Sequence, residues 1–541
     1  MSQMPKSTAR CFIHRPARLK RRFAAIASVA ALLMTVSPGG AETLKWARSL
    51  DVQTLDPHAY NENVTFAFNR QMYEGLVERS DDGKLIGVLA TEWRMLPDHP
   101  DVWEFKLRRN VTFHDGAPFK ADDAAFSIQR AMAPTSNVRT YLAAAAVEEA
   151  IAKDDYTVQV KTKGPSPLLP ENLASIFIMN RAWAEKNDSV VPQDFKGGKE
   201  NYAARHENGT GAYRLVSRES DRRSELEAYD KYWGIGQFPI DIDRIIYTPI
   251  QSAATRVSAL ISGEVNFLQD VPPQDISRLE QNESLRVVRG PEIRTVFLGV
   301  NTSANTLASG EAKGNPFADK RVRHAMNMSI DRLAIKSAIM RGESVPLGTI
   351  ISPIADGYTE ELGKFPKLNI DQAKQLMAEA GYPNGFSVTL NCPNDGMVND
   401  ERICQAVVAM LAKIGVTVHL DVQPSAVVWP LVLNRKTDFY LMTWGSYDSQ
   451  LIFDNLVHSR GAWAAANYKN PEIDAKIELL RSEADPQRRK TIIAEIWKTV
   501  QDECFYLPIH AQVLARATQK KIHVTPNVGN QISVKTIKVD K

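Results

Sequence analysis

The sequence lacks the short motifs that mark most catalytic and nucleotide-binding sites. It contains no GxGxxG, GxxxxGK, HExxH or GxSxG pattern and no CxxC pair, which argues against a dinucleotide or phosphate site, a zinc protease and a serine hydrolase. The histidines also stand singly: His58, His324 and His510 each lack a second histidine three or four residues away, so an ordinary zinc or nickel cage is not expected. These absences predict a protein that is not an enzyme, with no catalytic residue, no bound metal and no cofactor.

Long hydrophobic runs are scarce as well. One apolar run, at residues 23–36, has about 14 residues, fewer than the roughly 20 that cross a bilayer. Seven Lys and Arg residues and no acid precede it, and small residues follow it up to Ala41, as in a cleaved signal peptide. We therefore predict that residues 1–41 are a signal peptide for general secretion, cleaved before Glu42. The mature chain is expected in the periplasm and not embedded in a membrane.

Without the predicted signal peptide, the chain has no excess of positive charge. Removal of the signal peptide takes away seven basic residues and no acidic one, so the formal net charge changes from +3 to −4. A mildly acidic chain without a basic patch gives no reason to expect a nucleic acid partner. Hydrophobic residues make up 44% and charged residues 24% of the sequence, which are ordinary values for a globular protein. Its length is enough for two or three folding units.

Only four cysteines are present, and Cys11 lies within the predicted signal peptide. Cys392 and Cys404 flank a segment that contains the turn-forming sequence PNDG at residues 393–396, so in an oxidising compartment we expect them to form a disulfide. The alternative is that all three remaining thiols are free and buried. Cys504 begins the apolar stretch CFYLP, where a buried thiol is expected.

The periodicity of the mature chain changes along its length. In the first part we expect strands at 44–47, 103–107, 156–160, 212–216 and 243–247 and helices at 64–73 and 252–262. The apolar segment 295–301 suits a strand that crosses into a second lobe. Beyond it helices at 371–380 and 401–414 alternate with strands at 386–390 and 416–422, which predicts an α/β lobe. Segments 521–524 and 537–539 are expected to be strands that return to the first lobe.

Several motifs are spread over nearly the whole mature chain. The most extended runs from LATEW at residues 89–93 to WEFKLRRNVTFHDGAPFKADD at residues 103–123. Shorter ones are LDPH (55–58), YEGL (73–76), GTGAY (209–213), NPFADKRVR (315–323), IDR (330–332) and NPEID (470–474). In this order they resemble the family 5 extracellular solute-binding proteins, which are the dipeptide-, oligopeptide- and nickel-binding components of ABC importers.

The resemblance implies an α/β fold of the two-lobe periplasmic-binding-protein type, with an extra subdomain in the first lobe. Carried onto this chain, the first lobe comprises residues 42–292 and 515–541, and its peripheral subdomain lies at about 86–207. The second lobe comprises residues 293–514. Strands between the lobes act as a hinge, and the ligand is enclosed when the lobes close.

The resemblance also implies where a peptide would be held. In peptide binders of the family, an aspartate in the loop after a second-lobe strand holds the peptide amine. Here the strand is 438–444 and the loop is GSYDSQ at 445–450, so Asp448 is the candidate amine anchor. The loop lacks the Asp-Pro-Asp pattern that is common in peptide binders.

Other binding residues are expected around this aspartate. Trp444 and Tyr447 are the candidate apolar walls of the site, and Ser446 lies in the same loop. Arg294 and Arg321 are candidates to bind a ligand carboxylate. For Arg321, however, we favour a structural ion pair within its motif over ligand binding.

The expected function is that of a monomeric periplasmic receptor that captures a short peptide and delivers it to the membrane permease subunits of an ABC importer. A second hypothesis keeps this transport role but replaces the peptide with a nickel chelate, haem, glutathione, an opine or an oligosaccharide. A third hypothesis, an exported hydrolase, would need a nucleophile and a base that converge in the fold. No motif indicates such a pair.

Overall fold

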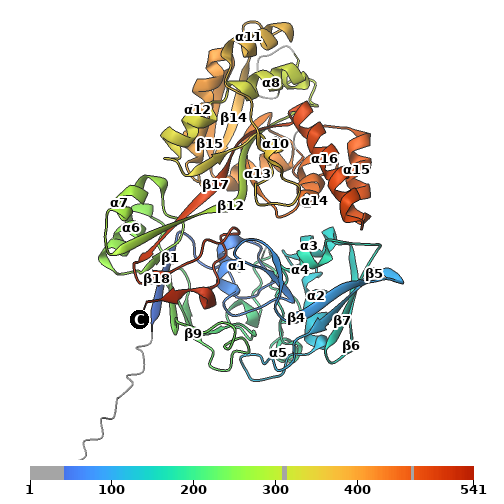
Figure 1. The fold of residues 1–541 in the computed structure, drawn as a ribbon, viewed down its shortest axis with the longest axis vertical. Coiled ribbons are helices and arrows are strands. Elements are labelled where there is room, and N and C mark those ends of the chain that lie inside the picture. The colour runs from blue at the N-terminus through green and yellow to red at the C-terminus, as the bar shows by residue number, and fades with distance from the viewer. Residues whose placement is uncertain (1–41, 196, 308–313, 465–467, 541) are drawn as a thin grey trace, which may run out of the picture. The chain divides into compact units, whose positions relative to one another are not determined.

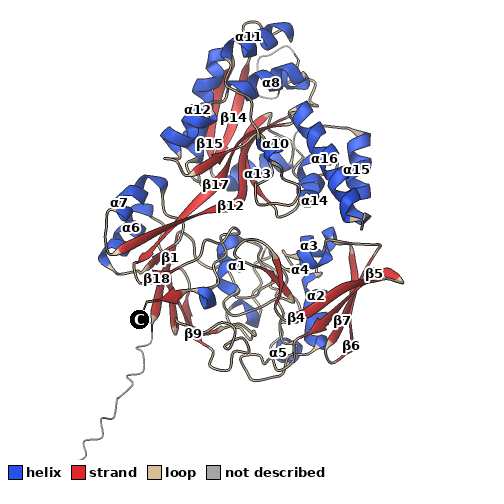
Figure 2. Ribbon diagram, viewed as in Figure 1, coloured by secondary structure: helices blue, strands red, loops and turns tan. Residues whose placement is uncertain are grey.

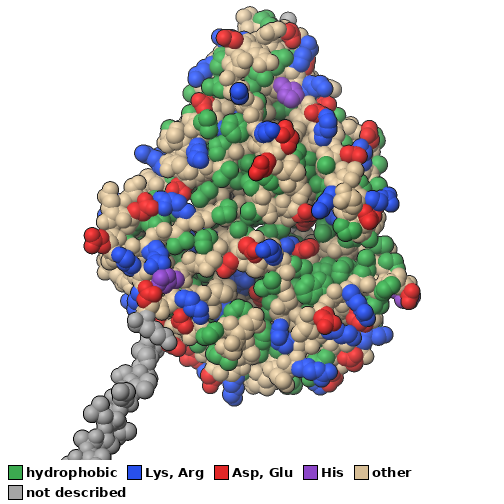
Figure 3. Space-filling view, in the orientation of Figure 1, with side chains coloured by type: hydrophobic (Ala, Val, Ile, Leu, Met, Phe, Trp, Pro, Cys, Tyr) green, Lys and Arg blue, Asp and Glu red, His purple; other side chains and the backbone are tan. Residues whose placement is uncertain are grey.

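The computed structural model describes residues 42–540 except 196, 308–313 and 465–467 (Figures 1 and 2). The predicted signal peptide, residues 1–41, lies outside the described residues. Among the residues that are described, no helix has both the length and the apolar character needed to cross a membrane. Acidic and basic side chains are interspersed over the face shown in Figure 3.

One large mixed sheet of 11 strands organises the chain. Its strands, in spatial order, are β15 (Thr417–Gln423), β14 (Ser387–Pro393), β16 (Phe439–Gly445), β12 (Leu285–Val300), β17 (Tyr506–Gln519), β11 (Phe267–Leu268), β1 (Thr43–Arg48), β10 (Arg244–Pro249), β9 (Arg223–Ala228) and β8 (Tyr213–Glu219). The eleventh, β13 (Ser344–Pro346), pairs with β17. Segments that are far apart in the sequence therefore share one hydrogen-bonded ladder.

Two long antiparallel strands, β12 and β17, occupy the middle of this sheet and join its two halves (Figure 1). They pair from Leu285 with Gln519 to Gly299 with Tyr506, with an irregularity between Pro291 and Thr295. One end of β17 pairs with β11, and one end of β12 pairs with β16. The crossing strand predicted at 295–301 is thus present, and it begins earlier, at Leu285.

A second sheet lies among residues 90–162. It has four antiparallel strands in the order β4 (Ala90–Leu96), β5 (His99–Leu107), β7 (Thr157–Thr162) and β6 (Val147–Asp154). Helix α2 (Ala121–Ala131) packs against β6 and β7. Buried Phe105, Ile128 and Val158 belong to one core cluster, so the apolar alternation of the strands and one face of the helix form a separate small core.

Helices flank the other end of the large sheet. They include α8 (Lys320–Ser329), α11 (Ile370–Glu379), α12 (Asp400–Leu411), α13 (Ser425–Leu433), α15 (Pro471–Ser482) and α16 (Pro486–Glu503). Helix α12 packs on β14 and β15, and the disulfide between Cys392 and Cys404 joins β14 to α12. The predicted disulfide is therefore present, and Cys504 is a buried free thiol as expected.

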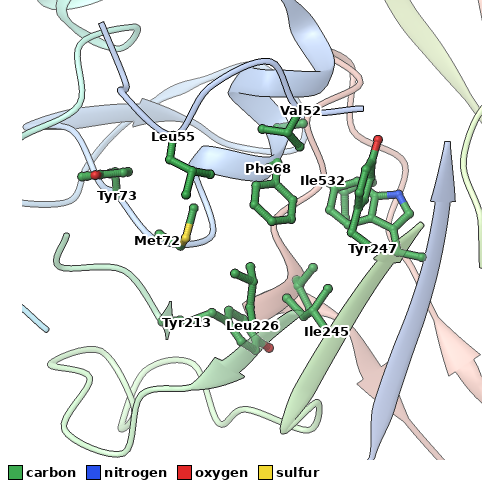
Figure 4. Close-up of a cluster of buried hydrophobic side chains, with 14 of the residues drawn as sticks. Val52, Leu55, Phe68, Met72, Tyr73, Tyr213, Leu226, Ile245, Tyr247 and Ile532 are labelled. Carbon is green, nitrogen blue, oxygen red and sulfur yellow. The ribbon is translucent and has the colours of Figure 1, made fainter. Parts of the chain in front are cut away.

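The buried side chains form five clusters, and each contains residues from only one side of the predicted lobe boundaries. Figure 4 shows part of one of them, where Phe68, Tyr213 and Tyr247 pack with Ile532 from the C-terminal segment. Burial of apolar area drives this packing. The predicted boundaries at 292/293 and 514/515 themselves stay a proposal.

Helix α1 (Asn63–Asn69) is shorter than the predicted helix at 64–73. After it ends, the carbonyl oxygens of Gln71 and Met72 accept hydrogen bonds from Tyr213 and Gly211, which replaces helical pairing. A Cβ on Gly211 would lie 2.5 Å from the Gln71 oxygen. The glycines of the GTGAY motif therefore allow the two backbone segments to approach each other closely.

Candidate functional site

A cavity of about 450 Å³ is lined by residues from both sides of the predicted lobe boundary at 292/293. Its walls come from the N-terminus of α1, strand β2 (Val77–Arg79), helix α4 (Leu169–Leu173), strand β12, the loop after β16 and residues 529 and 531. Four predicted site residues line it, namely Arg294, Ser446, Tyr447 and Asp448. The volume falls within the roughly 300–1,000 Å³ typical of small-molecule sites.

Trp444, the remaining predicted wall residue, is not among the residues that line this cavity. Its ring instead packs against Trp463, with 6.1 Å between ring centroids in an edge-on arrangement. Side chains alternate across a strand, so Trp444 on β16 supports the wall from behind. Arg321 also lies elsewhere and forms an ion pair with Asp319 at 2.6 Å, as its motif suggested.

Asp448 is held by the start of helix α14 (Ser449–Ile452). Its carboxylate is the N-cap and accepts a hydrogen bond from the backbone N–H of Leu451 at 3.1 Å, and the Ser446 hydroxyl donates to the Asp448 carbonyl oxygen at 2.7 Å. Burial raises the pKa of Asp448 above its ordinary value, although the Leu451 N–H and the nearby cations of Arg79 and Arg489 oppose the shift. Within the described part of the chain, no cation forms an ion pair with this carboxylate within 4.0 Å.

Tyr447 contacts the opposite side of the cavity. Its ring lies 4.5 Å from the guanidinium carbon of Arg79 on β2, and a Cβ on Gly83, in the turn after β2, would lie 3.1 Å from the same ring. Burial raises the pKa of Tyr447 to about 12. The phenol is therefore neutral at physiological pH, and its ring forms an apolar wall.

Arg294 lies in the cavity wall but already has an acidic partner. It forms an ion pair with Glu292, whose side chain is buried and also accepts a hydrogen bond from Gln512. Burial lowers the pKa of Arg294, and the adjacent Glu292 carboxylate more than offsets this, so the pKa is raised overall. The guanidinium is charged, and that charge is neutralised within the wall.

Sequence reasoning did not identify four further charged residues of the wall. Arg70 pairs with Glu78 at 3.0 Å, and Arg79 pairs with Glu171. Glu78 and Arg79 are two of the three residues of the short strand β2, where Glu78 is buried and Arg79 is half-buried, and buried charges of this kind are usually paired. Glu171 belongs to no recognised motif, so nothing in the sequence alone pointed to it.

Besides Glu292, one more charged wall residue was not predicted, namely Glu62. Its carboxylate caps α1 and accepts hydrogen bonds from the backbone N–H groups of Val64 at 2.7 Å and Thr65 at 3.0 Å. In the described residues no group of three or more His, Cys, Asp or Glu side chains is arranged to hold a metal ion. The wall is thus built from helix-capping carboxylates and internal ion pairs.

Comparison with known proteins decides the family. The sequence profile described as bacterial extracellular solute-binding proteins, family 5, middle region, matches residues 84–464. The chain belongs to this family. It is a solute-binding protein of the ABC transporter type and not an enzyme, so the hydrolase hypothesis is withdrawn.

Two curated relatives are named glutathione-binding protein GsiB. The one from Pectobacterium atrosepticum is 24% identical over 518 residues, covering 93% of this chain and 95% of the relative. The one from Shigella flexneri serotype 5b is 27% identical over 389 residues, covering 72% of this chain and 71% of the relative.

Solved structures of family 5 type show the same fold. The substrate-binding protein CtaP from Listeria monocytogenes has a TM-score of 0.79 at 21% identity, covering 92% of this chain and 99% of its own. DppA from Helicobacter pylori in complex with the peptide STSA has a TM-score of 0.75 at 20% identity, covering 93% and 98%. The predicted fold class, an α/β periplasmic-binding-protein fold of family 5 type, is therefore confirmed.

Proposed function

We propose that this chain is a periplasmic receptor that captures a short peptide between two lobes and delivers it to the permease subunits of an ABC importer. The observation that carries the peptide hypothesis is Asp448, a half-buried carboxylate that lines the cavity without an ion-pair partner among the described residues. A desolvated carboxylate of this kind is best satisfied by a charged donor such as a peptide ammonium.

The supporting context is the position of the cavity. Tyr447 and Asp448 follow β16, in the proposed second lobe, whereas Arg79 on β2 and Glu171 on α4 lie in the proposed first lobe. A ligand that contacts both groups stabilises the closed arrangement by its differential affinity for that state. The crossing strands β12 and β17 are the proposed hinge, and residues 42–292 with 515–541 and residues 293–514 are the proposed lobes.

Export is part of the same proposal. The family is described as extracellular, and removal of residues 1–41 would release the chain into the periplasm. The described chain carries its disulfide between Cys392 and Cys404, which suits an oxidising compartment. The receptor is proposed to act as a monomer.

A second candidate is the same transport role with a ligand that is not an ordinary peptide. The curated relatives are named for glutathione, and among similar structures AgaA holds agropinic acid and NikA from Staphylococcus aureus holds Ni(L-His)2. Haem and oligosaccharides are further ligand classes for this role. These names belong to those proteins, and each identity is below 30%.

A thermal-shift screen of the mature protein tests the proposal. A library of short peptides is measured, and every hit is repeated with its α-amine acetylated. The proposal expects free peptides to raise the melting temperature, because only the folded closed form binds them, and expects acetylation to abolish the effect. No shift with any peptide would instead favour the second candidate, and recovery of cleaved peptide would contradict a binding-only role.

A further inference from the structure

The cavity wall carries eight charged side chains, and their pairing leaves an acidic excess. The acidic members are Glu62, Glu78, Glu171, Glu292 and Asp448, and the basic members are Arg70, Arg79 and Arg294. Each arginine forms an ion pair with one wall glutamate: Arg70 with Glu78, Arg79 with Glu171, and Arg294 with Glu292.

The charge of each arginine of this wall is therefore already balanced by a glutamate before a ligand arrives. The Arg70 and Glu78 side chains are only 7% and 8% exposed, and the Glu292 side chain is 2% exposed. Removing one partner from a buried ion pair is strongly unfavourable because the other charge is left uncompensated. A ligand carboxylate that approached one of these cations would also lie close to the negative charge of its glutamate partner.

Two carboxylates remain without an ion pair in the described residues, those of Glu62 and Asp448. Both accept hydrogen bonds from the first N–H groups of a helix, which stabilises their charge but does not cancel it. Glu78 adds a further acceptor, since its Oε1 is buried and has no hydrogen-bond partner in the described structure. Among its described residues the wall thus carries more negative than positive charge, and two of its carboxylates have no cationic partner.

Glu171 and Asp448 both line the cavity, and they come from different elements. Glu171 is on α4, and Asp448 precedes α14. Burial raises the pKa of Glu171; Arg79 opposes this, and the negative charges of Asp448 and Asp356 raise it further. The two carboxylates therefore repel each other across the cavity, and a cation placed between them would relieve that repulsion.

We propose that the ligand of this cavity is a small organic cation of net positive charge, with an ammonium group held between Asp448 and Glu171. The inference rests on the proposed transport function and narrows its ligand class. A short peptide with a lysine or arginine side chain and a non-peptide amine share this chemistry. Glutathione carries two carboxylates and one ammonium, so it suits this wall poorly although the curated relatives are named for it.

Calorimetric titration of the mature protein at pH 7 and low salt tests the charge preference. The probes are the dipeptides Lys-Ala, Ala-Ala and Glu-Ala, glutathione, and the diamine putrescine. We expect Lys-Ala to bind on the order of tenfold more tightly than Ala-Ala, and Glu-Ala and glutathione to bind most weakly, because like charges in a partly desolvated site repel. The preference should shrink as salt is added.

The outcomes separate this inference from the broader proposal. Equal or tighter binding of Glu-Ala or glutathione would overturn the inference and leave a receptor for peptides intact. Binding of putrescine with no dipeptide bound would support the organic cation and contradict the peptide. Failure of all five probes to bind would contradict both.

A pair of variants tests the role of Glu171. Glu171→Gln removes one carboxylate of the cavity, whereas Glu185→Gln removes one from an exposed ion pair with Arg181 outside it. We expect Glu171→Gln to lower the affinity for the preferred cationic ligand about tenfold and to reduce the ratio of that affinity to the affinity for Glu-Ala. Glu185→Gln should change neither the affinity nor the ratio. Glu171→Gln also removes the partner of Arg79, so without ligand it should melt below the wild type, whereas Glu185→Gln should melt close to it. An unchanged preference in a folded Glu171→Gln protein would exclude this residue from the site.

Discussion

The guanidinium of Arg79 lies over the ring of Tyr447, 4.5 Å from the ring centroid. Arg79 also pairs with Glu171, and Tyr447 is next to Asp448 in the chain. This contact joins β2 to the loop after β16. A cation–π contact of this kind contributes about 0.5–2 kcal/mol depending on its exposure.

The role of Asp448 can be tested without disturbing its helix. Asp448→Asn keeps a side-chain oxygen to accept from the Leu451 N–H and removes the charge. We expect a loss of roughly 2 to 5 kcal/mol of affinity for an amine-bearing ligand, measured by titration calorimetry, and a melting temperature without ligand close to that of the wild type.

The matched control is Asp485→Asn, because Asp485 is the exposed N-cap of α16 and accepts from Arg488 at 2.7 Å. It should bind ligand like the wild type. Comparable losses in both variants would show that the effect comes from helix capping and not from the cavity.

The disulfide between Cys392 and Cys404 should stabilise the chain. Closing a loop of this length is worth about 3 kcal/mol in the chain-entropy model, so replacing both cysteines by serine should lower the free energy of unfolding by about that amount in urea. Thiol titration of the denatured, unreduced mature protein should find one free thiol, that of Cys504. Three free thiols would refute the pairing.

His114 predicts a pH dependence of stability. Its Nδ1 lies 2.7 Å from Glu207 and its Nε2 lies 3.0 Å from the Gly211 carbonyl oxygen. Burial lowers the pKa of His114, but the Glu207 carboxylate and the Gly211 carbonyl outweigh it, so the folded-state pKa is above the ordinary 6.5. This stabilisation is fully present below the unfolded pKa and is lost as pH rises through the folded pKa.

The stability difference between wild type and His114→Gln should therefore be larger at pH 5.5 than at pH 9, as measured by thermal unfolding. His206→Gln, which replaces an exposed histidine, provides the comparison for the loss of an imidazole side chain as such. A His114 difference that grows toward pH 9 would contradict the charged pair with Glu207.

The predicted signal-peptide cleavage can be tested at the N-terminus that it would create. N-terminal sequencing of the secreted protein should begin at Glu42. The Glu42 backbone nitrogen lies 3.0 Å from the Asp243 carboxylate, so the α-amino group created by cleavage would gain an acidic partner there. A start several residues away, or retention of residues 1–41, would contradict the predicted site.

Helices and strands were predicted well where the residues that start and end them are neighbours in the sequence. Helix α6 (Ala253–Ser262) begins after the N-cap Ser252 and ends at Gly263, whose φ of 79° favours glycine. By contrast, the end of α1 depends on hydrogen bonds to residues about 140 positions away, at Gly211 and Tyr213. No window of neighbouring residues contains that information.

The site was predictable only in part for the same reason. The family resemblance led to the loop that contains Asp448 and Tyr447, because that loop directly follows a strand. Glu171 and Arg79 meet it only through the tertiary fold. The sequence also did not show that the charge of Arg294 is neutralised. Its partner Glu292 is only two residues away, but the position of the Glu292 side chain depends on its buried hydrogen bond with Gln512.

The crossing strands β12 and β17 have a consequence for how the chain loses its structure. Strand β12 is hydrogen-bonded to β16 and β17, and β17 is hydrogen-bonded to β12, β13 and β11. Melting either half of the sheet would therefore leave one of these two strands with an unpaired edge exposed to water. Residues 42–540 should therefore unfold cooperatively and give a single calorimetric peak, unlike proteins whose domains are joined by flexible linkers.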